Sequence, residues 1–259
     1  MKTTMLILPA LMTMPLLPAS NSQSQLANQA QDPFIGAIET MKRSIAPLVC
    51  LSVKGEESTV LDRLGSAFFV STEGEFVTAA HVIAEMQKSD RACPVSAITL
   101  PLEGWQPGVP NEPTAWLAFK IGDCAIDTLL DVAKCRAMID RSGPMAERGL
   151  RIVPVKFEWE IPPDGTQVAF TGFPLGVRDP MTFRAGVAAN RPVWRDGKVI
   201  PQLVLDRTAW PGFSGSPVFV SDGRVIGILF AGVINEGTAM TFLRPASAVR
   251  EMIAKRTKK

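Results

Sequence analysis

The sequence contains no tyrosine and a single histidine, and it has little surplus charge. Zinc sites usually combine several Cys and His ligands. One histidine and four cysteines without a CxxC pair do not supply such a set, so we expect no metal site and no cofactor. The net charge is only +2, which lacks the basic surplus typical of nucleic-acid-binding proteins, so we expect no nucleic acid partner. No apolar run after the N-terminal one reaches the roughly 20 residues of a membrane-spanning helix.

Proline and glycine are plentiful, at 21 and 20 residues, which favours short strands joined by turns. From residue 44 onward, short apolar runs alternate with turns, and Pro245–Lys255 has the spacing of an amphipathic helix. Asp140–Gly149 is polar and contains Gly143 and Pro144, so it is the best linker candidate. These patterns predict an all-β fold with two lobes, residues 44–142 and 143–259, and a short C-terminal helix.

The N-terminus has the layout of a secretory signal peptide. Lys2 precedes the uncharged and mostly apolar Met5–Leu17, and small residues follow at Ala19 and Ser20. We therefore expect a signal peptide over residues 1–20, a flexible leader over residues 21–43, and export to the periplasm or the extracellular space. The mature chain is expected to have no membrane span.

The four cysteines are expected to form disulfides after export. Ser96–Leu100 and Ala115–Lys120 look like two strands of a hairpin. Such a hairpin would bring Cys93 and Cys124 together beyond its open end, so Cys93–Cys124 is the expected pair. Four cysteines allow three pairings, and the sequence does not exclude the other two.

The single histidine, His81, follows an apolar run that ends in the small residues Ala79 and Ala80. Small residues let the backbone approach and leave the imidazole unpacked. A second notable segment, Pro211–Val218, places Ser214 between Gly212 and Gly215. Glycines near a serine permit the backbone conformation that an oxyanion hole needs.

A serine nucleophile requires a base, and the base requires an orienting carboxylate. His81 is the only imidazole in the chain, and Asp123, Asp127 and Asp131 lie between it and Ser214. The order His, Asp, Ser is that of chymotrypsin-type proteases, and it differs from the order in subtilisins and in α/β-hydrolases.

With these motifs, the sequence resembles the chymotrypsin-fold (trypsin-like) serine proteases, and more narrowly the bacterial peptidases of the high-temperature-requirement type. The resemblance extends over about residues 44–255, which is most of the mature chain. The segments that carry it are Gly65–Val70, Val77–Val82, Asp131–Ala133, Gly172–Gly176, Pro211–Val218, Gly223–Ile228 and Phe242–Pro245.

The resemblance implies two six-stranded antiparallel β-barrels with the active site in the cleft between them. It implies His81 as general base and then general acid, Asp131 as its orienting carboxylate, and Ser214 as nucleophile. The N–H groups of Gly212 and Ser214 would form the oxyanion hole. The residues after Asp131 depart from the family pattern, so Asp127 remains the alternative carboxylate. Because the histidine must be neutral to act as a base, activity should fall in acid.

Three departures from relatives are informative. Phe213 stands where digestive proteases have the Asp that captures a newly cut N-terminus, so we expect no such activation step. Thr208, six residues before the nucleophile, would lie at the base of the specificity pocket and offers no counter-ion for Lys or Arg. We therefore expect a small or apolar residue before the cut. The expected pocket walls are Ile228, Leu229 and Phe230. About one helix follows Pro245, so we expect no PDZ domain.

These features predict an exported serine endopeptidase that acts on protein or peptide substrates through an acyl-enzyme. The alternative is a latent or inactive member of the same fold that serves as a binding module. The presence of His81, Asp131 and Ser214 favours the enzyme. An esterase would share the chemistry but not the motif context.

Overall fold

The structure is a computed structural model that describes residues 32–55, 57–88, 93–101, 116–140, 152–235 and 238–255. The predicted signal peptide, most of the predicted leader and the predicted boundary between the lobes at 142/143 lie outside these residues. In the part of the chain that is described, no helix has the length and apolar character needed to cross a membrane.

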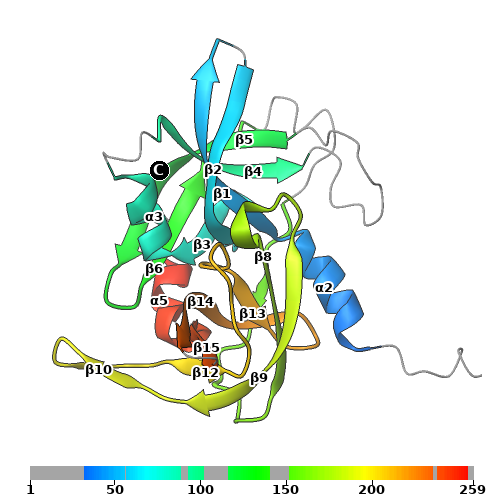
Figure 1. The fold of residues 1–259 in the computed structure, drawn as a ribbon, viewed down its shortest axis with the longest axis vertical. Coiled ribbons are helices and arrows are strands. Elements are labelled where there is room, and N and C mark those ends of the chain that lie inside the picture. The colour runs from blue at the N-terminus through cyan, green and yellow to red at the C-terminus, as the bar shows by residue number, and fades with distance from the viewer. Residues whose placement is uncertain are drawn as a thin grey trace, which may run out of the picture. The chain divides into compact units, whose positions relative to one another are not determined.

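The first lobe is a closed antiparallel barrel, coloured blue to green in Figure 1. The strands follow one another around it in the order β1-β2-β3-β6-β5-β4. Their bounds are β1 Ile45–Lys54, β2 Glu57–Phe69, β3 Glu75–Ala79, β4 Val95–Pro101, β5 Trp116–Asp127 and β6 Val132–Ala137. Buried apolar side chains such as Leu48, Phe69, Phe76 and Ile98 form one core cluster here.

The second lobe also closes on itself. Its strands pair in the order β13-β8-β9-β12-β15-β14, and pairing between β13 and β14 completes a ring of six, to which β7 adds in parallel. Their bounds are β7 Lys156–Phe157, β8 Gln167–Gly172, β9 Met181–Asn190, β12 Leu203–Leu205, β13 Pro217–Phe219, β14 Arg224–Asn235 and β15 Thr238–Pro245. The predicted all-β fold with two barrels is confirmed.

The predicted C-terminal helix is present as a 3-10 turn, η3 (Ala246–Val249), followed by α5 (Arg250–Ala254). Its end is held by the first barrel, beside β6 in Figure 1. Lys134 on β6 is buried and donates hydrogen bonds to the carbonyl oxygens of Ile253 (2.9 Å) and Lys255 (2.6 Å). The same ammonium lies 3.2 Å from the carboxylate of Glu75. The C-terminal helix therefore joins the two barrels.

The sequence did not predict helix α2 or the β10–β11 hairpin. Helix α2 (Phe34–Lys42) occupies residues assigned to the leader, because Phe34, Ala37 and Met41 recur at helical spacing and pack into a core cluster. Strands β10 (Val193–Arg195) and β11 (Lys198–Ile200) form a separate hairpin. Its turn, Asp196-Gly197, has positive φ at both residues, as a two-residue hairpin turn requires.

The expected Cys93–Cys124 disulfide is wrong: the pairs are Cys50–Cys93 and Cys124–Cys135. The predicted β4–β5 hairpin exists, and its register, with Ala97 opposite Lys120, would continue to Cys93 opposite Cys124. However, β5 leaves β4 after Lys120 and pairs with β6, where Cys124 lies directly opposite Cys135. Cys93, just before β4, lies next to β1, the other neighbour of β4.

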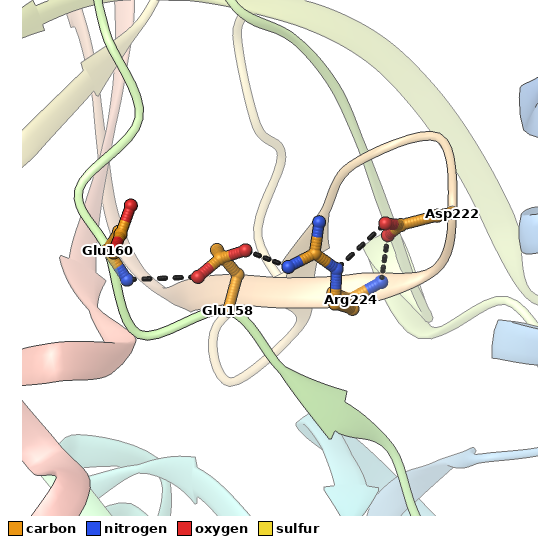
Figure 2. Close-up of polar contacts among 4 residues, drawn as sticks. All are labelled: Glu158, Glu160, Asp222 and Arg224. Carbon is orange, nitrogen blue, oxygen red and sulfur yellow. Dashed lines mark hydrogen bonds and ion pairs between the residues drawn. The ribbon is translucent and has the colours of Figure 1, made fainter.

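A polar network fastens the turn between β13 and β14 to the segment after β7 (Figure 2). Arg224 donates its Nε to Asp222 at 2.7 Å and its Nη1 to Glu158, whose carboxylate also accepts the backbone N–H of Glu160. The backbone N–H of Arg224 bonds to Asp222 as well. This backbone bond, and then the guanidinium, hold the pKa of the Asp222 carboxyl below its usual value.

Candidate active site

His81 and Asp131 form a direct pair. His81 is the second residue of helix α3 (Ala80–Met86), which begins where β3 ends, and Asp131 immediately precedes β6, the strand paired with β3. Nδ1 of the imidazole lies 2.8 Å from Oδ2 of Asp131. The other carboxylate oxygen, Oδ1, accepts the backbone N–H of His81 at 2.9 Å. One carboxylate thus holds both the ring and the main chain of the histidine.

The turn that carries Asp131 has a left-handed conformation at that residue, with φ of +55°. Asp and Asn tolerate this region better than most residues. The backbone oxygen of Asp131 accepts the N–H of Ala80 at 3.2 Å, which ties the turn to the start of α3. Asp127, the alternative carboxylate, accepts the N–H groups of Leu129 (3.0 Å) and Leu130 (2.8 Å). Asp127 therefore shapes the turn, whereas Asp131 contacts the histidine.

Ser214 lies between two glycines, Gly212 and Gly215, whose backbone conformations favour glycine. Gly212 has φ of +94°, and a Cβ there would lie 2.5 Å from the carbonyl oxygen of Phe173. Gly215 has φ of +87°, and a Cβ there would lie 2.1 Å from the carbonyl oxygen of Ser66. The Gly-rich sequence around the serine is thus required by close backbone packing.

The peptide between Pro211 and Gly212 is oriented by a hydrogen bond. The carbonyl oxygen of Pro211 accepts the N–H of Leu175 at 2.7 Å. In a trans peptide the C=O and N–H groups point in opposite directions, so the N–H of Gly212 points away from Leu175. None of the described residues accepts a hydrogen bond from the N–H of Gly212 or Ser214. Both predicted oxyanion donors are thus unoccupied by the protein itself.

Ser66, on β2 of the first barrel, forms hydrogen bonds to the backbone of three residues near the predicted nucleophile. Its side chain is buried, donates to the carbonyl oxygen of Gly212 at 2.8 Å, and accepts the N–H of Phe173 at 2.9 Å. Its backbone N–H donates to the carbonyl oxygen of Ser214 at 2.9 Å. No local pattern in the sequence marks Ser66 for this role, although it lies in the segment Gly65–Val70.

A cavity of about 390 Å³ opens beside the histidine. Its lining includes His81 and Asp131 from the first barrel, and Phe230 and Arg195 from strands of the second lobe and its hairpin. Most of the exposed surface of this lining is apolar, and the polar side chains are those of His81, Thr128, Asp131 and Arg195. Within the described part of the chain, His81 has no hydrogen bond through Nε2, so that nitrogen remains open to a partner.

The predicted specificity residues lie in different environments. Ile228 and Leu229 are buried in two separate core clusters, and Phe230 is partly buried and lines the cavity beside the histidine. Thr208 is partly exposed. Phe213 is fully buried and packs against Phe170 and Phe183, at ring centroid distances of 5.0 and 5.2 Å. The buried aromatic ring of Phe213 thus fixes the segment Pro211–Val218, called the serine loop below, to the core of the second barrel.

Comparison with protein families decides the identity of this arrangement. The model of the trypsin-like peptidase domain matches residues 65–228, which is more than half of the chain. The chain belongs to the trypsin-like peptidase family. It is therefore a serine peptidase, as the motifs around His81 and Ser214 predicted. The comparison with curated protein sequences found no match.

Solved structures similar to the peptidase share its fold at low sequence identity. The active form of the Rv3671c protease from M. tuberculosis has 18% identity and a TM-score of 0.61, over 98% of this chain and 96% of that one. Deg5 has 18% identity and a TM-score of 0.61, over 86% and 93%. The MamO protease domain from Magnetospirillum magneticum has 15% identity and a TM-score of 0.58, over 83% and 98%.

Proposed function

We propose that the peptidase is an exported endopeptidase that cleaves protein or peptide substrates with His81, Asp131 and Ser214. The observation that carries the proposal is the contact of 2.8 Å between Nδ1 of His81 and Oδ2 of Asp131. A carboxylate at Nδ1 keeps the proton on that nitrogen and leaves Nε2 as the base. The two disulfides support export, because such bonds persist in oxidising compartments.

In this mechanism, Oγ of Ser214 attacks the substrate carbonyl carbon while Nε2 of His81 takes the hydroxyl proton. The new imidazolium is stabilised by Asp131, and the oxyanion is stabilised by the N–H groups of Gly212 and Ser214. His81 then donates the proton to the departing amine as the peptide bond breaks. Water attacks the acyl-enzyme by the same route and regenerates Ser214.

The substrate preference is proposed from the predicted pocket. Thr208 at its base carries no charge, so a small or apolar residue before the cut is favoured over Lys or Arg. A peptide library with varied residues at that position tests this. The variant Thr208→Asp should gain cleavage after Lys or Arg if the residue lies at the pocket base. No change in preference would place the base elsewhere.

A fluorophosphonate probe tests the catalytic assignment directly. Intact-mass analysis of the folded protein should show one adduct, which the variant Ser214→Ala should lack. Turnover should fall about 10⁶-fold in that variant. Absence of an adduct from the folded wild-type protein would refute the proposal and favour a binding module.

The carboxylate assignment has a matched pair of variants. Asp131→Asn should lower kcat by about 10⁴-fold, because the wrong imidazole tautomer is then favoured. Asp127→Asn should cost far less, because an amide oxygen can still accept the N–H groups of Leu129 and Leu130. The reverse order of effects would show that Asp127 is the orienting carboxylate.

A further inference from the structure

Arg244 is a buried cation that the proposed chemistry does not use. It lies on β15 of the second lobe and is only 3% exposed. The neighbouring Leu243 is also buried, in a core cluster of the second barrel. Since successive side chains of a strand point to opposite faces, Arg244 must be covered on the other face. A buried charge is costly unless its environment provides partners.

The partners of Arg244 lie close to the active site. Its Nε donates to the carbonyl oxygen of Leu130 at 2.9 Å, and its Nη1 donates to that of Pro201 at 2.6 Å. Its guanidinium carbon lies 4.3 Å from the ring centroid of Phe230, the aromatic wall of the cavity beside His81. Leu130 belongs to the first barrel, so this side chain bridges the two lobes.

The electrostatic surroundings of Arg244 include the active-site carboxylate. Burial lowers the pKa of its guanidinium from the usual value, and Arg195 acts in the same direction. The carboxylates of Asp131 and Asp127 act in the opposite direction. Arginine remains protonated throughout the working range of a protein. A permanent positive charge therefore lies next to the turn that carries Asp131, in contact with the carbonyl oxygen of Leu130.

The bond from Arg244 to Leu130 adds a restraint on the turn that carries Asp131. The N–H of Leu130 is held by Asp127, and the carbonyl oxygen of Asp131 accepts the N–H of Ala80. The carbonyl of Leu130 belongs to the peptide plane between Leu130 and Asp131, and the rotation of this plane sets φ of Asp131. Arg244 holds this plane, and φ of Asp131 is the left-handed value of +55°.

We propose that Arg244 is a positioning residue for the pair His81–Asp131. By holding the carbonyl of Leu130, it keeps the turn in the conformation that aims the carboxylate at Nδ1 of the histidine. The inference rests on the proposed function, but its structural core can be tested without catalysis. Arg244 acts from the second lobe on the pair in the first lobe, so the geometry of that pair depends on both lobes.

The single histidine makes a direct spectroscopic test possible. In protein labelled with ¹⁵N-histidine, the nitrogen shifts of the neutral imidazole report the tautomer of His81 alone. The wild type should carry the proton on Nδ1. In Arg244→Met the population should move toward the Nε2–H tautomer, and Arg244→Lys, which cannot span both carbonyls, should be intermediate. The matched control Arg224→Met removes an arginine at the start of β14 that bonds to Asp222 and Glu158, so it should leave the tautomer unchanged.

The same variants are then treated with the fluorophosphonate probe. The rate of inactivation should fall about 10- to 100-fold in Arg244→Met, well short of the roughly 10⁴-fold effect of losing the carboxylate. An unchanged tautomer in folded Arg244→Met or Arg244→Lys would overturn the inference, even if the rate fell. The tautomer could shift in the variants while the wild-type protein forms no adduct with the fluorophosphonate probe. That result would support the positioning role of Arg244 and refute the proposed function.

Discussion

The substitution Ser66→Ala tests whether one buried hydroxyl holds the serine loop. The side chain of Ser66 donates to the carbonyl oxygen of Gly212 and accepts the N–H of Phe173, over 2.8 and 2.9 Å. Alanine fits the space but leaves both backbone groups without this partner. A buried unpaired group costs about 1–3 kcal/mol. Allowing for some relaxation of the loop, the free energy of unfolding should fall by roughly 2–4 kcal/mol.

A neighbouring serine provides the control. Ser216 Oγ is buried and has no hydrogen-bond partner among the described residues. Both hydroxyls lie over Gly172, where an added Cβ would come within 2.6 Å of Ser66 Oγ and 2.0 Å of Ser216 Oγ. Ser216→Ala removes an unpaired polar group, so stability should stay the same or rise. Both variants thus remove one buried hydroxyl beside Gly172. Ser66→Ala loses two hydrogen bonds, whereas Ser216→Ala loses none that the described residues make.

Thermal unfolding followed by the fluorescence of the five tryptophans measures the difference. For a chain of this size, about 1 kcal/mol corresponds to roughly 2–4 °C, so Tm of Ser66→Ala should fall by roughly 4–16 °C. Labelling by the fluorophosphonate probe should also slow, because Gly212 is no longer held. Equal Tm values for Ser66→Ala and Ser216→Ala would refute the reasoning.

Three further predictions concern other parts of the molecule. Gly212→Ala should lower kcat by about 10²–10³-fold in peptide hydrolysis, because the oxyanion donor cannot keep its backbone conformation; unchanged kcat would exclude that donor. Lys134→Met should lower the free energy of unfolding in urea by about 3–5 kcal/mol, because it breaks the buried ion pair in which the ammonium lies 3.2 Å from the carboxylate of Glu75; a loss below 1 kcal/mol would contradict this. Asp222→Asn should lower Tm slightly at neutral pH. Since Arg224 depresses the pKa of Asp222, that difference should persist above the usual value of 3.8 and vanish as pH falls below it; a constant difference down to pH of about 2 would contradict the cause.

The strands were predictable because their signals are local. Most are short apolar runs between turns, as in β3, β8 and β13. The motif around Ser214 also depends on neighbours in the sequence. The full length of the longer strands was harder to predict from the sequence. In β2, for example, backbone pairing continues beyond the apolar stretch and extends the strand back to Glu57.

Features that depend on distant pairing were not predictable. The disulfides follow from β5 exchanging β4 for β6 as its partner, which no local pattern records. Ser66 lies 107 residues from Phe173, and Arg244 lies 114 residues from Leu130. In the sequence Ser66 resembles any polar strand residue, and Arg244 resembles an exposed charge. Their roles become visible only when the two lobes are folded against each other.

The link between Lys134 and the end of helix α5 has a consequence for the order of synthesis. The described strands of the first barrel end at Ala137, yet the buried ammonium of Lys134 finds its carbonyl partners only at Ile253 and Lys255. During translation, more than 100 residues must still follow before this charge is fully satisfied. We expect a chain truncated at residue 243 to show no probe labelling, and robust labelling would contradict this. Hydrolytic competence would then arise last, once synthesis of the polypeptide is complete.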